Sequence, residues 1–505
     1  MNFRSLPGDL ELLSVHLQNV EWSANSLLNL SKPTPENLLK YPKASKKISR
    51  VGFIVQAFAL LPGIVLRICA GLLLSVLTPW EWWKSPKKQI KKFDWLIISN
   101  TSNLRSPASV DSVMAPFASV IESKIAYLYL NAELTSFRGK KRFPDFDAHE
   151  NLFICPKTEN PISTLRQSIK SLVAISEAIS LMAKNTETTL QQKFLLLNVM
   201  RAQFSRETMR NLLIGKEVSR IAKEISARHL IYSFEGNAHE LSILSRLKSN
   251  ANGVEMLPYQ HAPIVTTQFG LQRQMQQFND NTIILTSGSI TKDYFQTLQK
   301  SSSFQHAILE AGSYKFNHET LNFQSVEPEK KEVVLFLPEA DIKSFLESLE
   351  IMKSLACDYE DVTFVIRKHP SLKLTKRLTR KIVSSLSTNC SLSSLTLTED
   401  FKRSMVCVFR SSAAAIEAAR FGVYPVHIDF RGEFNLNPFD SNFFKTGIQK
   451  ANTCEELKEL IGLMFSKKLE KSGEYNDQLR DFAESYFSDP LNSNFRKYLT
   501  ERRIN

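Results

Sequence analysis

The chain has 505 residues, of which 43% are hydrophobic, and its formal net charge at pH 7 is +13. A chain of this length is expected to form more than one domain, each with its own hydrophobic core. The basic excess suits a nucleic acid, a membrane surface or an anionic substrate. However, the sequence has no zinc-finger spacing, RNA-binding aromatic motif or basic heptad array, so no nucleic-acid partner is expected.

The cysteines and the first residues indicate a cellular compartment. The cysteines are scattered without a CxxC pair, which favours free thiols in a reducing cytoplasm over a disulfide framework. They are Cys69, Cys155, Cys357, Cys390, Cys407 and Cys454. Met1–Gln18 is mixed polar and lacks the features of a secretory signal. We expect a cytoplasmic protein, peripheral or monotopic at the inner face of the cell membrane.

The first segment, residues 1–92, contains the most hydrophobic stretch of the chain, Val51–Leu77. The pair Pro62-Gly63 interrupts this stretch, and basic clusters flank it on both sides. Positive charge on both flanks suits an apolar helical hairpin with both ends in the cytoplasm. We therefore favour a membrane-associating hairpin. A true membrane span and a buried hairpin or oligomer contact remain open.

A first α/β domain is expected over residues 93–325. Short apolar runs at Phe93–Ser99, Ala126–Leu130 and Leu152–Cys155 predict strands. The 3.6-residue apolar spacing of Pro161–Leu230 predicts a helical insertion. Between these segments, Asp145-Phe146-Asp147 matches an acidic metal-binding pattern, but it lies in a loop rich in Pro and Lys/Arg. We interpret it as an exposed loop and expect no metal.

Two polar side chains follow neighbouring predicted strands in this domain. His229–Phe234 predicts a strand followed by Glu235, and Gly253–Tyr259 predicts another followed by Gln260 and His261. A carboxylate at a strand end can act as a general base, and an imidazole can share that role or stabilise a departing phosphate. The alternative is structural: Glu235 would pair with Arg246, and His261 would be a satisfied histidine at the edge of the core.

Further along, Gly288 and Ser289 open a predicted helix after the strand Thr282–Ser287. Unpaired backbone N–H groups at a helix N-terminus favour anions, so Gly288 is a candidate nucleotide contact.

A second α/β domain is expected over residues 326–505, after a charged linker at Glu327–Lys331. Val333–Pro338 predicts a strand, Ile342–Ala356 a helix and Val362–Ile366 the next strand. This alternation favours a parallel, doubly wound sheet.

The second domain carries two motifs of polar residues at strand ends. Arg367, His369 and Pro370 follow one strand, and Ser411 and Ser412 lie between the strand Val406–Phe409 and an Ala-rich helix that should end at Gly422. Each motif alone has a structural interpretation, as a turn or as an ordinary N-cap. Together they predict an anion site at the carboxyl edge of a sheet.

The two motifs resemble the donor half of GT-B glycosyltransferases. More narrowly, they are similar to bacterial surface-polysaccharide transferases: the polysialyl and Kdo transferases that use CMP-sugars, and the CDP-glycerol transferases. The resemblance implies nucleotide-phosphate contacts for Arg367, His369, Ser411 and Ser412, and a ribose contact for Glu417. It also implies two Rossmann-like domains facing a cleft, with terminal helices that return to the first domain.

The resemblance also includes Glu235-Gly236, which matches the last two residues of an acidic-acidic-Gly motif whose second acidic residue is the base. This chain has Phe234 in place of the first acidic residue.

We therefore predict a metal-independent, cofactor-free glycosyltransferase that uses a nucleotide-sugar donor, with a CMP-activated nonulosonate or Kdo favoured, and a surface-glycan or lipid-linked acceptor at a membrane surface. No P-loop occurs and no GxGxxG follows a strand, which argues against ATP hydrolysis and dinucleotide chemistry. The alternatives are a CDP-polyol phosphotransferase of the same fold and a non-catalytic, membrane-tethered scaffold of polysaccharide assembly.

Overall fold

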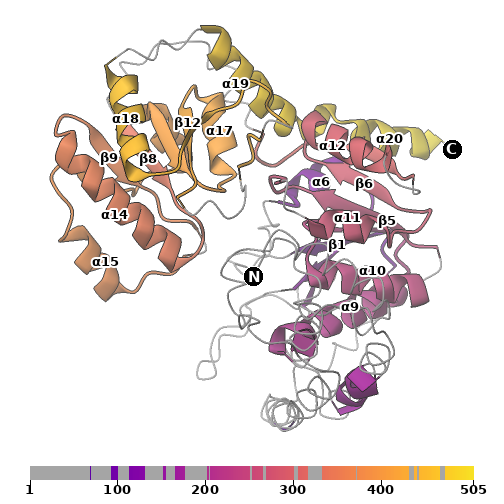
Figure 1. Cartoon of the computed structure of the whole chain (residues 1–505). Helices are drawn as coiled ribbons and strands as arrows, with labels where there is room; N and C mark the ends of the chain where they lie inside the picture. Colours follow the sequence, from indigo (N-terminus) through magenta and orange to yellow (C-terminus); the bar gives the residue numbers. More distant parts are fainter. Residues whose placement is uncertain are drawn as a thin grey trace, which may run out of the picture.

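A computed structural model describes most of the two α/β units (Figure 1). The described ranges are 92–99, 113–130, 152–154, 165–173, 205–250, 253–265, 269–300, 305–316, 333–370, 372–430, 437–440, 443–466 and 473–504, with short pieces at 69, 175–176, 199 and 202–203. Several predictions lie outside these residues: the hairpin at 51–77, the acidic loop at 145–147, much of the helical insertion at 161–230, and the linker at 327–331.

The first unit is built on a seven-stranded parallel sheet in the order β3-β2-β1-β4-β5-β6-β7. Its strands are β1 (Trp95–Ser99), β2 (Ile125–Tyr129), β3 (Leu152–Ile154), β4 (His229–Ser233), β5 (Glu255–Gln260), β6 (Ile283–Thr286) and β7 (Ala307–Glu310). Strands β1 and β6 are buried along their whole length, as expected of a parallel sheet covered on both faces.

Helices cover both faces of the first sheet. They are α6 (Ala115–Val120), α9 (Arg206–Glu224), α10 (Ala238–Asn250), α11 (Phe269–Met275) and α12 (Ser289–Lys300). Alternate residues of β1 separate the two cores: Leu96 packs with α9, α10 and α11, whereas Ile97 packs with α6 on the other face. Helix α9 starts where the Ser205 side chain accepts a hydrogen bond from the Thr208 amide.

The second unit is built on a six-stranded parallel sheet in the order β10-β9-β8-β11-β12-β13. Its strands are β8 (Val333–Leu337), β9 (Thr363–Ile366), β10 (Cys390–Leu392), β11 (Val406–Phe409), β12 (Tyr424–Ile428) and β13 (Gln449–Ala451). Its helices are α14 (Ile342–Asp358), α15 (Lys376–Val383), α16 (Leu397–Arg403), α17 (Ala414–Arg420), α18 (Cys454–Phe465) and α19 (Gly473–Tyr486). Helix α17 is followed by Gly422 in the left-handed conformation (φ 64°), as predicted for a helix-terminating glycine.

Both sheets share one topology. Counted within each unit, six strands of the first sheet and all six of the second run 3-2-1-4-5-6, the order of Rossmann-like domains. The predicted α/β class with two Rossmann-like domains is therefore confirmed. In this order the chain changes direction between β1 and β4 and between β8 and β11, and ligands bind such sheets outside the carboxyl ends of those strands.

The C-terminal helices connect the two units (Figure 1). Helix α19 packs against α17 of the second unit and α12 of the first. Helix α20 (Asn494–Ile504) then packs on the first unit, where Phe495 and Leu499 join the core that contains Trp95 and Phe117. The return of the terminal helices to the first domain, which the resemblance implies, is present in the structure.

Among the described residues, no helix combines the length and the apolar character that a membrane crossing requires.

Candidate active site

The two predicted catalytic residues meet at the carboxyl edge of the first sheet. Glu235 follows β4 and His261 follows β5, and these neighbouring strands are parallel. The Glu235 Oε1 and the His261 Nε2 lie 3.0 Å apart, within hydrogen-bond distance. The Glu235 side chain is 31% exposed and that of His261 is 15% exposed, so the carboxylate is the more accessible partner. His261 is thus a direct partner of the Glu235 carboxylate.

A buried carboxyl group that the sequence analysis missed holds the loop of Glu235. The side chain of Glu240, at the start of α10, is fully buried. It accepts hydrogen bonds from the backbone N–H groups of Glu235, Gly236 and Asn237 at 2.8–3.1 Å, and from the Asn237 side-chain amide at 3.1 Å. These bonds fix the backbone that carries Glu235. The spacing of Glu235 and Glu240 on either side of a Gly-Asn turn is the signal that was present in the sequence.

Two buried side chains beside this loop, Glu240 and His239, have shifted pKa values. Burial raises the pKa of Glu240 to about 8, and the negative charge of Glu235 acts in the same direction. Burial lowers the pKa of His239 to about 4, although the charge of Glu235 opposes that shift. Both groups therefore favour their neutral forms near pH 7, which leaves Glu235 as the carboxylate at this strand end.

Phe234, which stands in place of the first acidic residue of the acidic-acidic-Gly motif, has a structural role. The Phe234 ring is fully buried, stacked on Phe295 and in contact with Phe278. Its side chain thus belongs to the core beneath the strand end, on the side away from the exposed carboxylate of Glu235. Gly236 is required for two reasons: its φ is +82°, and a Cβ would come within 2.7 Å of the Gly270 carbonyl carbon.

The second sheet places a hydroxyl and carboxylate cluster at its own change of direction. The Ser411 hydroxyl, after β11, donates to Glu339 Oε1, after β8. The other oxygen of Glu339 accepts from the Ser344 hydroxyl at 3.1 Å and lies 3.8 Å from the Arg410 guanidinium. Ser412 accepts from the Ala414 amide at 3.3 Å, but the N-cap position of α17 is Ala413, without a side-chain cap. The prediction of a serine N-cap was therefore wrong by one residue.

A lysine from the first unit reaches this edge and was missed by the sequence analysis. Lys315 Nζ lies 2.6 Å from Glu417 Oε1, and both side chains are largely buried, with 10% and 20% exposed. Burial is the largest single effect on Lys315 and acts to lower its pKa, but the charge of Glu417, the nearby Tyr314 and the hydrogen bond to Glu417 together raise the pKa. Arg420 donates to the Lys315 carbonyl at 3.1 Å and so fixes the lysine backbone. No local motif marks Lys315, because its partner lies in the other domain.

His369 lies near the same lysine. The ring is half-buried after β9, and its pKa is lowered, first by burial and then by the charge of Lys315. Pro370 is exposed, and the turn is closed by the Leu372 amide, which donates to the His369 carbonyl at 3.0 Å. The structure thus brings His369, Ser411, Ser412 and Glu417 to one edge of the second unit, with Lys315 added from the first.

Arg367 has a structural role that the sequence analysis did not foresee. Its guanidinium lies 2.6 Å from the fully buried carboxylate of Asp400 and donates to the Leu395 carbonyl at 2.8 Å. Arg403 and the Ser393 hydroxyl bind the same carboxylate. These contacts all use Nη1 of the guanidinium, and the phosphate contact of Arg367 stays a prediction beside this internal ion pair.

Gly288 is likewise explained by packing. Its amide donates to the Thr291 hydroxyl at 3.2 Å. A Cβ at this position would collide with the Ser485 carbonyl and come within 2.6 Å of the Tyr486 carbonyl oxygen, both at the end of α19. The Ser287 hydroxyl donates to the same Tyr486 carbonyl at 3.0 Å. The start of α12 thus packs against the returning C-terminal helix, and the nucleotide contact at Gly288 stays a prediction.

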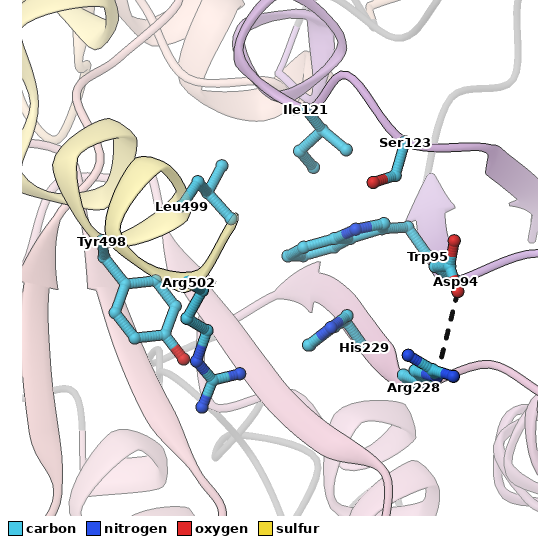
Figure 2. A pocket seen from close by; sticks show the side chains of 9 residues that line it. All are labelled: Asp94, Trp95, Ile121, Ser123, Arg228, His229, Tyr498, Leu499 and Arg502. Carbon is cyan, nitrogen blue, oxygen red and sulfur yellow. Dashed lines mark ion pairs between the residues drawn. The ribbon is translucent and has the colours of Figure 1, made fainter. Parts of the chain in front are cut away.

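A cavity of about 210 Å³ lies at the opposite, amino edge of the first sheet (Figure 2). Its floor includes the rings of Trp95 and His229, stacked with centroids 4.2 Å apart. Arg502 and Tyr498 of α20 line another wall and bind the Glu255 carboxylate at 2.9–3.0 Å. These contacts fasten α20 to β5. None of the predicted site residues lines this cavity. Ligands of open parallel sheets bind outside the carboxyl ends of the strands, which is the other edge of this sheet.

Within the described residues, no group of three or more His, Cys, Asp or Glu side chains is arranged to hold a metal ion. The acidic loop 145–147 lies outside them.

The comparisons with known proteins give structural neighbours only. No protein-family model matches the chain, and no curated protein matches its sequence. Among solved structures, a UDP-N-acetylglucosamine 2-epimerase from Listeria monocytogenes aligns at 11% identity and a TM-score of 0.45, over 78% of this chain and 92% of that one. The UDP-GlcNAc 2-epimerase from Neisseria meningitidis, bound to UDP-GlcNAc, aligns at 10% identity and a TM-score of 0.44, over 81% of this chain and 99% of that one.

A glycosyltransferase of kitacinnamycin aligns at 8% identity and a TM-score of 0.42, over 78% of this chain and 95% of that one. The structural neighbours are thus GT-B glycosyltransferases and sugar-nucleotide epimerases. The function is argued below from the residues themselves.

Proposed function

We propose that the protein is a glycosyltransferase that moves a sugar from a nucleotide donor to a glycan or lipid-linked acceptor. The observation that carries this proposal is the contact between Glu235 and His261, 3.0 Å apart at the change of direction of the first sheet. A carboxylate and an imidazole in hydrogen-bond contact at a strand end are suited to proton transfer. The matching edge of the second sheet supplies hydroxyl and cationic groups instead.

In the proposed reaction, an acceptor hydroxyl oxygen attacks the anomeric carbon of the donor while the bond from that carbon to the phosphate oxygen breaks. The hydroxyl proton passes to the carboxylate of Glu235, which is the more exposed member of the pair. His261 orients that carboxylate through its Nε2. Glu240 acts as a positioning residue, because its bonds go to the backbone on either side of Gly236.

The leaving nucleotide departs with the negative charge of its phosphate. Ser411, Ser412 and His369 line the edge where a phosphate would lie, and Lys315 is a buried cation whose charge acts on His369. Such groups stabilise a leaving phosphate most strongly where water is excluded. In this proposal Glu417 holds the ribose, as the resemblance implies, with Lys315 fixing the orientation of its carboxylate.

For the donor we propose a CMP-activated nonulosonate or Kdo first, because the His369-Pro370 and Ser411-Ser412 pairs resemble enzymes that use such donors. A CDP-polyol would occupy the same edge, with transfer of a polyol phosphate in place of a sugar. In either case we propose a surface glycan or a lipid-linked glycan as acceptor and a membrane surface as the place of action, at the cytoplasmic side.

A non-catalytic scaffold is the second candidate, and a specific observation favours it. Two residues that the resemblance assigns to the nucleotide, Arg367 and Glu417, are ion-paired within the protein. A scaffold would keep the fold, but would neither bind a donor nor release a nucleotide from it.

A nucleotide panel separates these candidates. The purified protein is heated with CMP, CDP or UDP while unfolding is followed, and release of nucleotide from CMP-Kdo, a CMP-nonulosonate, CDP-glycerol and a UDP-sugar is measured by mass spectrometry. The proposal predicts stabilisation by a cytidine nucleotide and release from a CMP-sugar. Release only from CDP-glycerol would identify the phosphotransferase, and release only from a UDP-sugar would overturn the donor choice. No stabilisation and no release with any compound would favour the scaffold.

A further inference from the structure

The second unit carries a basic surface on and just before α15. Residues 362–398 include seven Lys and Arg side chains and no Asp or Glu. One of the seven, Arg367, is half-buried against Asp400, and the other six are exposed. These six define the α15 surface: Lys368, Lys373, Lys376, Arg377, Arg380 and Lys381.

The helix has one inner and one outer face. Ile382 is buried in the core of the second unit, and Leu378 and Leu374 pack against that core. Leu378 and Ile382 are four residues apart and so lie on the inner face of the helix, and Leu374 packs against the same core just before the helix begins. The basic side chains of α15 therefore lie on the outer face, and Val383 at its end has a side chain that is 53% exposed. Figure 1 shows α15 at the periphery of the second unit.

No internal partner accounts for these charges. Arg367 and Arg403 both share the carboxylate of Asp400. By contrast, none of the four cations of α15 forms an ion pair within the part of the chain that the structure describes; they are Lys376, Arg377, Arg380 and Lys381. Four unpaired cations within two helical turns repel one another, which an anionic partner would relieve.

We propose that the α15 surface docks onto an anionic lipid bilayer. The apolar side of α15 packs on the protein, so the part left for a partner is the basic outer face with the exposed Val383 beside it. Clustered Lys and Arg side chains of this kind are attracted to the negative surface of acidic lipids. A single-stranded nucleic acid would need aromatic side chains for base stacking, and there is none between Phe364 and Phe401. The charge is spread over a convex helical face, which favours an extended anionic surface as the partner.

Docking through α15 would orient the protein as well as bind it. His369 lies in the segment between β9 and α15, so the candidate donor edge is connected directly to the proposed membrane face. A lipid-linked acceptor would then be presented near that edge. The proposed docking does not depend on the proposed transferase activity. The experiment that tests it measures vesicle binding alone.

The test uses the full chain and three proteins. The first is the wild type. The second carries Lys376→Gln, Arg377→Gln, Arg380→Gln and Lys381→Gln. The third is a control that also loses four exposed positive charges, through Lys223→Gln, Lys248→Gln, Lys300→Gln and Lys343→Gln. Cosedimentation is measured with vesicles of phosphatidylcholine alone and with vesicles containing phosphatidylglycerol, at low and high salt. Circular dichroism melts check that all three fold.

The wild type should partition preferentially to phosphatidylglycerol vesicles, and salt should weaken this preference. The α15 variant should lose at least about tenfold in that partition, and the control variant should lose much less. The basic clusters at 43–50 and 84–92 remain in every protein, so the difference reports α15. Equal binding by wild type and the α15 variant would overturn the proposal, as would equal losses in both variants. Loss of binding to a soluble polyanion such as heparin, with vesicle binding intact, would overturn it in favour of an acidic polymer.

Discussion

The two units have the same strand order and different chemistry at the same place. Both sheets change direction between their first and fourth strands. In the first unit that point carries the Glu235–His261 pair, and in the second it carries Ser411 bonded to Glu339, with Lys315 and His369 nearby. The repeated topology therefore provides two similar edges, and the residues after each strand decide the task. We assign proton transfer to the first edge and nucleotide binding to the second.

The largest expected effect comes from Glu235→Gln, which removes the base and keeps the size of the side chain. Transfer should fall by about 10²–10⁴-fold, because a positioned general base contributes that much, while nucleotide-induced stabilisation should persist. Initial rates with the donor found in the nucleotide panel measure the effect. Glu360→Gln, at an exposed carboxylate, is the matched control. Activity equal to that of the control would break the division of tasks.

Gly288→Ala separates the packing role of this glycine from its predicted nucleotide contact. An added methyl group meets the carbonyl oxygens at the end of α19, so unfolding should become easier by about 1–3 kcal/mol. Ser289→Ala, which removes only a 3.3 Å bond to the Ser485 carbonyl, should cost less. Urea titrations followed by fluorescence measure both. A stable Gly288→Ala protein that has lost nucleotide binding would support the prediction made from the sequence.

Arg367→Met asks whether this arginine belongs to the fold or to the nucleotide site. Breaking a buried ion pair typically costs about 3–5 kcal/mol, and a smaller loss of about 1–3 kcal/mol is expected because Arg403 and Ser393 still bind Asp400. Arg377→Met, at an exposed and unpaired position, should change stability by less than about 0.5 kcal/mol. Nucleotide affinity of the folded Arg367→Met protein should match the wild type. A large loss of affinity with unchanged stability would show that Arg367 acts on the ligand.

The sequence predicted the strands and strand-end residues well because both are local properties. The β-branched and aromatic runs before Glu235, His261 and His369 each form a strand, and neighbouring parallel strands brought Glu235 and His261 together. The misses are long-range contacts. Nothing near Gly288 indicates that Tyr486 will pack on it, and nothing near Lys315 indicates Glu417 as its partner.

Arg367 shows the same limit at shorter range. Its partner Asp400 follows two further elements, α15 and β10, so the strand-end position suggested a ligand where the fold supplies a carboxylate.

A further prediction concerns the pH dependence of stability at the first edge. Burial raises the pKa of Glu240 to about 8, above its ordinary value of 4.5. Between these values the folded protein keeps a proton that the unfolded chain releases, so the contribution of Glu240 to stability is present at low pH and is lost as pH rises towards 8. Glu240→Gln should remove this dependence. The unfolding free energy of the wild type should fall relative to that of Glu240→Gln as pH rises from 5 to 8, and a constant difference between them would contradict the assigned pKa.

The most direct measurement is calorimetric titration of the stabilising nucleotide into the wild type, Glu235→Gln and His369→Ala. If the second edge binds the nucleotide and the first transfers the proton, His369→Ala should weaken binding by about tenfold, the equivalent of one charge-assisted hydrogen bond, and Glu235→Gln should leave it unchanged. Weakened binding in Glu235→Gln together with wild-type affinity in His369→Ala would contradict the account.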